Sequence, residues 1–209
     1  MPVNDSSTGG PLLPIAGGPA PLEGRALNDF IQGWIAGITG LPGSLVRPRW
    51  QAEPPNIPNQ GTTWAAVGVT VRPADSFAAV YHNGAGNAGN GQDEEHQHEQ
   101  LDILASFYGL SSNSDADKYA ALLRQGLQIS QNLELLTLNG MGLSACGDPT
   151  AVPSLFKTRW LYRVDLPVQV NREIVRYYPV LNLLKAQVTI IAANAAGSAI
   201  TETETVTLP

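Results

Sequence analysis

The stretch RWLYRVDLPVQVNREIVRYYPV, residues 159–180, carries the strongest structural signal in the chain. In its first half, apolar and polar residues alternate, which is the period of a β-strand with one buried face. The apolar positions are Trp160, Tyr162, Val164, Leu166, Val168 and Val170, and the polar positions are Arg163, Asp165, Gln169 and Asn171. Residues 160–170 would span about 36 Å at about 3.3 Å per residue. We therefore expect a strand that runs past its own core and offers an edge to another subunit.

The second half of this stretch predicts a turn at Asn171-Arg172 and a return strand over 173–180, because aromatic and β-branched residues are frequent there. The whole stretch would form a long protruding β-hairpin. Its arginines suit subunit contacts because guanidinium groups bind carboxylates in a bidentate way, although a solvated strand face would use them too. We expect the interface to include Trp50, Arg159, Arg163, Asp165, Arg172, Arg176 and Tyr178.

Composition excludes several classes of protein. The 209 residues include 21 glycines and 16 prolines but only 14% charged residues, which indicates a loop-rich protein with strands rather than a coiled coil. A net charge of −6 argues against a nucleic-acid-binding surface, which needs a stripe of basic residues. The single Cys146 excludes an intrachain disulfide and a thiolate metal cage. No apolar run is long enough to span a membrane and no signal peptide is evident, so we expect no membrane partner and assembly in the cytoplasm.

Residues 1–24 are rich in proline, glycine and serine and have no periodicity. They predict either a disordered tail or an extended arm that docks on a neighbour. The arm has apolar residues for docking, which a purely solvating tail does not need: Leu12, Leu13, Ile15 and Leu22. We therefore divide the chain into an N-terminal arm, 1–24, and one domain, 25–209.

The remaining patterns predict an α+β fold, with a mixed, largely antiparallel sheet flanked by two main helices. Apolar residues at helical spacing place the helices at 27–38 and 115–131, with a further helical turn or two at 132–138. Alternation and β-branched residues predict strands at 64–72, 77–82, 99–108, 141–146 and 184–192. We expect 64–82 to form a β-hairpin and 83–92, rich in glycine and asparagine, to form a loop. Residues 198–208 are expected to be an outer strand or a tail.

His96 and His98 are the most enzyme-like feature of the sequence. On a strand they would share one face, and this spacing can place two imidazoles on one metal ion, with nearby carboxylates as further ligands. The alternative is a solvated polar segment, because the adjoining Gly/Asn loop would not hold a metal site rigidly. Cys146 is expected to be a small buried residue. No nucleophile elbow is present, and no apolar pocket is evident that would raise the pKa of a carboxyl group for acid catalysis. We therefore expect no catalytic residue, metal or cofactor.

Five segments together resemble the phage neck or tail-terminator proteins of contractile-tailed bacteriophages. They are LPGSLVRPRW (41–50), WAAVGVT (64–70), LDILASFYG (101–109), YAALLRQGLQI (119–129) and VDLPV (164–168). The resemblance runs in order from about 27 to 192, and it leaves out the 1–24 arm and the 83–95 segment.

This resemblance implies a structural virion protein. Such proteins form a homohexameric ring in the neck that caps the tail tube, terminates tail polymerisation and joins the tail to the head connector. The implied partners are other copies of the chain, the tail tube, the head-side connector proteins and, as a further candidate, the sheath protein. DNA would pass through the lumen without sequence-specific binding, and an acidic wall would let it slide. The family has no catalytic motif, so no active-site residue carries over.

Three other functions stay open from the sequence. One is a head-completion or connector protein that acts as a stopper on the head side. Another is a metal-dependent enzyme that uses His96 and His98. The third is a monomeric ligand-binding β domain, which would need neither the arm nor an overhanging strand.

Overall fold

A computed structural model describes residues 4–51, 58, 61–109, 115–156, 159–183, 185–193 and 199–207. The chain divides into two compact units. The larger, here the core unit, consists of Pro19–Ala79 and His96–Val175. The smaller, here the arm unit, consists of Met1–Gly18, Val80–Glu95 and Arg176–Pro209.

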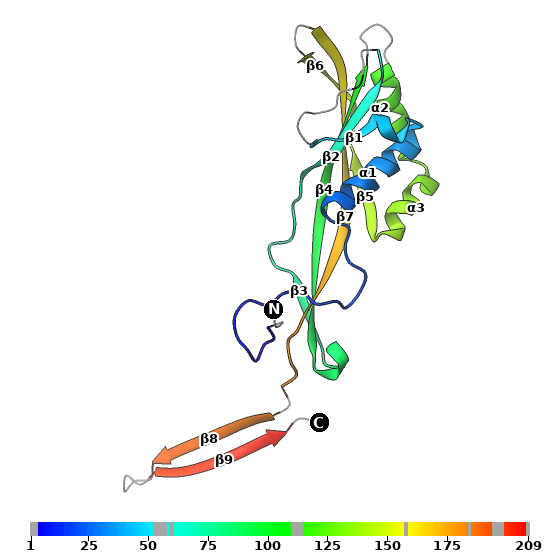
Figure 1. Ribbon diagram of the computed structural model, residues 1–209. Coiled ribbons are helices and arrows are strands. Elements are labelled where there is room, and N and C mark those ends of the chain that lie inside the picture. The colour runs from blue at the N-terminus through cyan, green and yellow to red at the C-terminus, as the bar shows by residue number, and fades with distance from the viewer. Residues whose placement is uncertain are drawn as a thin grey trace. The chain divides into compact units, whose positions relative to one another are not determined.

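Seven strands form one mixed, mostly antiparallel sheet in the order β1-β2-β4-β7-β5, with β3 paired to β4 and β6 paired to β7 (Figure 1). The strands are β1 (Val46–Pro48), β2 (Trp64–Val71), β3 (Ala79–Asn83), β4 (Gln92–Gly109), β5 (Met141–Cys146), β6 (Thr150–Phe156) and β7 (Arg159–Tyr178). β1 is parallel to β2, and the pairs β2–β4, β5–β7 and β6–β7 are antiparallel. The predicted α+β class and sheet type are confirmed.

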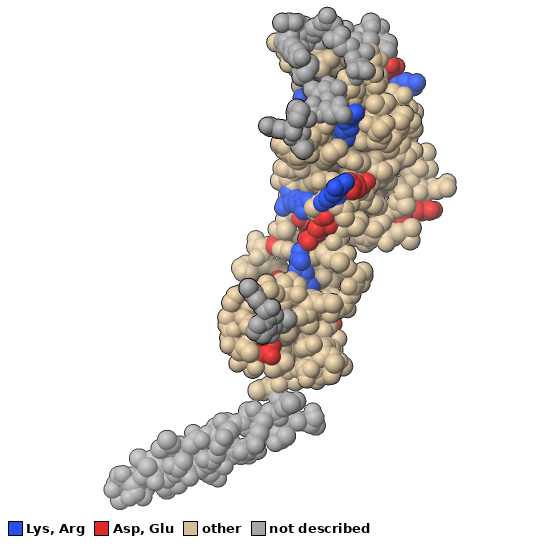
Figure 2. Space-filling model, viewed as in Figure 1, with Lys and Arg blue, Asp and Glu red and all other residues tan. Residues whose placement is uncertain are grey.

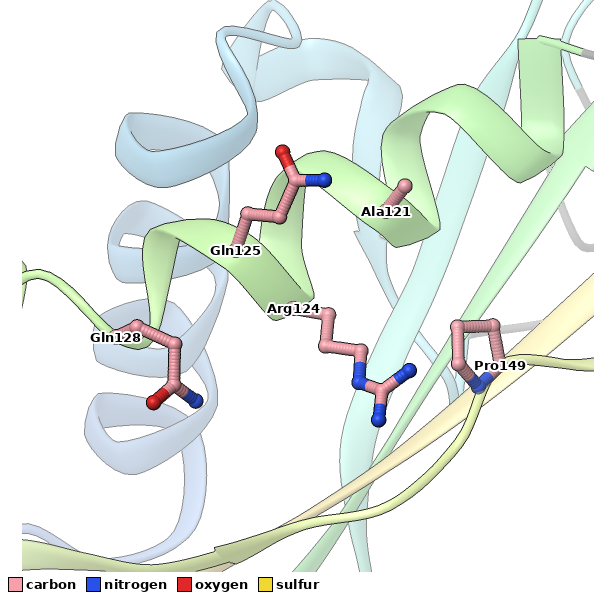
Figure 3. A pocket seen from close by; sticks show the side chains of 5 residues that line it. All are labelled: Ala121, Arg124, Gln125, Gln128 and Pro149. Carbon is pink, nitrogen blue, oxygen red and sulfur yellow. The ribbon is translucent and has the colours of Figure 1, made fainter.

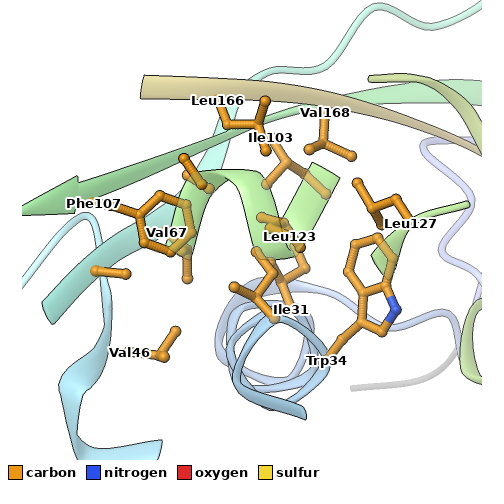
Figure 4. Packing of buried hydrophobic residues seen from close by; sticks show 14 of the residues in the cluster. Ile31, Trp34, Val46, Val67, Ile103, Phe107, Leu123, Leu127, Leu166 and Val168 are labelled. Atoms are coloured by element: carbon orange, nitrogen blue, oxygen red, sulfur yellow. The ribbon is translucent and has the colours of Figure 1, made fainter. Parts of the chain in front are cut away.

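The helices α1 (Gly24–Thr39), α2 (Asp115–Gly126) and α3 (Ser130–Leu138) lie on one side of this sheet in the core unit (Figure 1). Two short 3₁₀ turns, Gly43–Leu45 and Asn87–Gly89, also occur among the described residues. Figure 4 shows apolar side chains of α1, α2 and the sheet meeting in one cluster. On β7 the buried positions are Val164, Leu166, Val168 and Val170, so the predicted alternation is confirmed there. None of the helices in the described ranges is long and apolar enough to cross a membrane.

The predicted turn at Asn171-Arg172 is wrong, because β7 is one unbroken strand of 20 residues. The ladder with β5 continues through the expected turn, pairing Gly142 with Asn171 and Met141 with Arg172. The alternation also continues, since Val170, Arg172 and Ile174 are all buried. The predicted protruding hairpin over 159–180 is therefore replaced by a single long strand.

The predicted hairpin over 64–82 is also wrong, because β2 and β3 each pair with β4 rather than with one another. The segment between them follows β4 as well: the Asp75 N–H donates to the His98 carbonyl at 3.1 Å. β4 is 18 residues long and begins at Gln92, earlier than predicted. The polar first half of β4 is predicted to be a loop from the sequence alone, yet it belongs to a strand that pairs with its neighbours in the sheet.

The described residues form three helices, because the further helical turns expected at 132–138 are a separate helix, α3. The chain leaves the helical conformation after Gly126 and re-enters it at Ser130. A Cβ on Gly126 would lie 2.3 Å from Cγ2 of Ile38, so glycine allows α2 to approach α1 closely. Strand β6 was missed by the sequence analysis because Pro153 interrupts its pattern, and an edge strand tolerates proline.

Within the arm unit, the described part of the N-terminal arm docks on its own chain. The Ile15 N–H donates to the Tyr177 carbonyl at 2.8 Å, and the Ser6 N–H donates to the Pro179 carbonyl at 3.1 Å. Gly17 lies against the Tyr177 ring, where a Cβ would be 2.3 Å from the ring Cγ. Docking on a neighbouring subunit stays a prediction, as does the division of the chain at residue 24.

The arm unit also contains a separate two-stranded antiparallel sheet. It is formed by β8 (Lys185–Ala193) and β9 (Ala199–Thr207), so the acidic segment at the end of the sequence is a strand rather than a tail.

Candidate subunit and tail interface

The sheet face without helices carries the Arg163 and Asp165 side chains of the predicted interface. These residues are two apart on β7, which places them on the same face of the strand. Arg163 donates from Nε to Asp165 Oδ1 at 2.8 Å and from Nη2 to Asp165 Oδ2 at 2.6 Å. The hydrogen bond with Asp165 raises the pKa of Arg163 above its ordinary value, with a smaller contribution from Tyr108. The two side chains thus form a fixed, electrically neutral pair on this face.

Neighbouring strands extend this polar face with packed aromatic rings. Trp64 on β2 and Tyr108 on β4 stack with ring centroids 4.3 Å apart. Arg49 Nη1 donates to Ser106 Oγ at 2.9 Å, which holds the chain after β1 against β4. Trp50 follows directly and is 77% exposed. An exposed tryptophan beside an anchored residue has the character of an interface hot spot.

Arg172 lies elsewhere, because it is 5% exposed on the side of the sheet that the core occupies. Its Nε donates to Glu99 Oε2 at 2.6 Å, and its Nη1 donates to the Leu22 carbonyl. This arginine links β7, β4 and the segment before α1 within one chain. We therefore leave Arg172 out of the proposed interface.

Two other predicted interface residues lie at the end of β7 in the arm unit. Arg176 and Tyr178 are both half-buried. Burial raises the pKa of the Tyr178 hydroxyl, and the neighbouring Glu95 adds to the rise. Arg159 begins β7, but its side chain lies outside the described residues.

The predicted docking residues of the arm differ in their exposure. Leu12 and Ile15 are half-buried in the arm unit, whereas Leu13 is 69% exposed. Leu22 belongs to the core unit, where it packs against the buried cluster. Of these four residues, Leu13 therefore has the most surface left for a partner.

The two histidines of the predicted metal site bind different carboxylates. His96 Nδ1 lies 2.7 Å from Glu173 Oε1, and His98 Nδ1 lies 3.4 Å from Asp75 Oδ2. Among the residues that the structure describes, no group of three or more His, Cys, Asp and Glu side chains could hold a metal ion. The geometry therefore gives no support to a metal-dependent enzyme.

Comparison with known families decides the class of protein. The sequence matches the phage neck terminator protein family over residues 25–194. The chain belongs to this family. It is a structural protein of the phage virion at the junction of neck and tail, and the resemblance seen in the sequence is confirmed. A search of curated proteins finds no match.

A neck terminator meets both tail and head components, and α3 offers a surface that the sequence analysis missed. Leu136 on this helix is buried, while Leu135 and Leu138 are 51% and 79% exposed. Leu135 and Leu138 are three residues apart, so they are neighbours on the helix surface and together expose an apolar patch. The signal was present in the sequence, since the segment SQNLELLTL has leucines on more than one helical face.

The charged groups of this family member are sparse on the face that Figure 2 shows, where most described surface is uncharged. Together with the exposed leucines of α3, this indicates a surface suited to protein contacts rather than to solvent alone.

A hollow of about 430 Å³ lies beside α2 and is lined by Ala121, Arg124, Gln125, Gln128 and Pro149 (Figure 3). At its edge, Arg124 Nη2 lies 2.7 Å from Asp148 Oδ1. Burial raises the pKa of the nearby Cys146 thiol, so this cysteine is not an activated nucleophile. The hollow therefore offers no catalytic constellation, in keeping with a structural family.

Proposed function

We propose that this chain forms a homohexameric ring that caps the tail tube of a contractile-tailed phage, stops tail polymerisation and joins the tail to the head connector. The family match over residues 25–194 carries the proposal, because it assigns the chain to the neck.

The two outer surfaces of the core unit support a ring. A ring subunit needs two different patches, because each copy meets its neighbours in a head-to-tail manner. One patch is the helix-free sheet face with Trp50, Arg163 and Asp165. The other is the outward side of α3 with Leu135 and Leu138, on the opposite side of the sheet. The two patches differ in chemistry, as head-to-tail contacts require.

The acidic balance suits a channel for DNA. With a net charge of −6, the chain has no excess of cations with which to hold phosphates. Repulsion between an acidic wall and DNA would keep the DNA mobile in the lumen, without sequence-specific binding.

The direct test is a phage whose gene for this chain is deleted, with tails measured by electron microscopy. We expect tails of uncontrolled length that fail to join filled heads, and restored length when the gene is supplied from a plasmid. A stopper on the head side would instead give tails of normal length and heads that lose their DNA. Normal, infectious virions from the deletion would contradict both assignments.

A further inference from the structure

The β8–β9 sheet lacks the strands that a stable sheet needs. Its two strands have nine residues each, and their pairing runs from Lys185 opposite Thr207 to Ala193 opposite Ala199. In the described part of the chain, no third strand pairs with either of them. A two-stranded sheet is marginally stable at best in water. Each strand also leaves a row of backbone N–H and C=O groups without partners along its outer edge.

The two outer edges differ in charge. β8 carries one charged residue, Lys185, and a run of uncharged residues follows it. β9 carries two acidic residues, Glu202 and Glu204, among threonines. Pairing β9 with another β9 would bring like charges together, which destabilises a strand pair. Pairing β9 with β8 of another copy avoids this repulsion, because the residues of β8 after Lys185 are uncharged.

We propose that β8 of one copy pairs with β9 of the next copy, so that the hairpins of a ring join into one continuous antiparallel sheet. The proposal rests on the ring of the proposed function. The contact is head-to-tail, which is the type of contact that closes into rings. A rotation axis along the strands keeps every β8 in the same direction, so each contact between copies is antiparallel, as it is inside the hairpin. Closure of the sheet removes every open edge.

Disulfide trapping between two single-cysteine variants tests this pairing. In a Cys146→Ser background, one variant carries Thr203→Cys on β9. The other carries Gln187→Cys, Thr189→Cys or Ile191→Cys on β8, because alternate positions sample neighbouring registers. Both variants are supplied together to the deletion phage, and the assembled particles are oxidised and run on a non-reducing gel. Asn139→Cys, an exposed position directly after α3, replaces the β8 variant as a matched control.

The proposal expects a disulfide-linked dimer in at least one of the three mixtures, and loss of that band on reduction. It expects no dimer from Thr203→Cys alone or from the Asn139→Cys mixture. Particles that contain both variants but give no dimer in any mixture would overturn the pairing and leave the ring intact. A dimer from Thr203→Cys alone would overturn it in favour of β9–β9 pairing. If the chain is absent from the particles, the proposed function fails and this inference fails with it.

Discussion

Replacing Arg172 by methionine should destabilise the folded chain severely. The sequence alone places Arg172 at a subunit interface, where the loss of one charge would cost the monomer little. The substitution leaves the Glu99 carboxylate without its cation, and Glu99 is itself only 10% exposed. It also leaves the Leu22 carbonyl without its donor. Removing one partner of a buried ion pair costs about 3–5 kcal/mol of unfolding free energy. For a chain of this size, that is a fall in Tm of roughly 6–20 °C.

Chemical denaturation followed by circular dichroism measures this loss. Arg25→Met is the matched control, because Arg25 pairs with Asp29 on the surface of α1 with 93% of its side chain exposed. Such a pair contributes about 0.5 kcal/mol or less. Adding Glu99→Gln to Arg172→Met should recover part of the loss, since the stranded charge is then removed. If Arg172→Met and Arg25→Met lost the same stability, the buried role of Arg172 would be refuted.

One titration and three substitutions test other features of the chain. The hydrogen bond with Asp93 raises the pKa of His82 above its ordinary value of 6.5. The protonated His82 therefore stabilises the folded chain fully below pH 6.5, and this contribution is lost as the pH rises through the pKa of the folded state. NMR titration of His82 should show the raised pKa, and an unshifted pKa would contradict the hydrogen bond. Gly126→Ala should destabilise the chain, because overpacking against α1 costs about 1–3 kcal/mol and outweighs the gain in helix propensity. Gly33→Ala has open space around it and should gain about 1 kcal/mol in the same melting assay; the reverse order would refute the packing argument. Leu138→Glu should leave Tm unchanged but reduce virion yield, and a normal yield would exclude this side of α3 from the interface.

The sequence predicts the features that follow from burying one face of a strand. The alternation from Val164 to Val170 located β7 and its core side correctly, since a half-buried strand must repeat every two residues. The prediction of a turn at Asn171-Arg172 is wrong because a charged residue such as Arg172 is usually exposed, whereas here it is buried. Its partner Glu99 lies far away in the sequence, and no local pattern reveals such a pair.

The polar part of β4 was missed for a related reason. Residues from Gln92 onward are held by backbone pairing with β3 and β7, which depends on the whole topology rather than on side-chain pattern. The candidate interface was predicted only in part. Arg163 and Asp165 lie on the face of β7 away from the core, as the alternation predicts, and their place in an interface stays a prediction. The exposure of Leu138 depends on how α3 packs.

The central claim is that a ring of six copies ends the tail tube, and cryo-electron microscopy of the neck tests it most directly. We expect six copies in one ring on the last layer of the tube, with the Arg163 face and the α3 face of adjacent copies in contact. Trp50→Glu, at a side chain that is 77% exposed, should then leave the monomer folded and prevent the ring from forming. A different number of copies, or a ring that contacts only the portal side of the neck, would contradict the account.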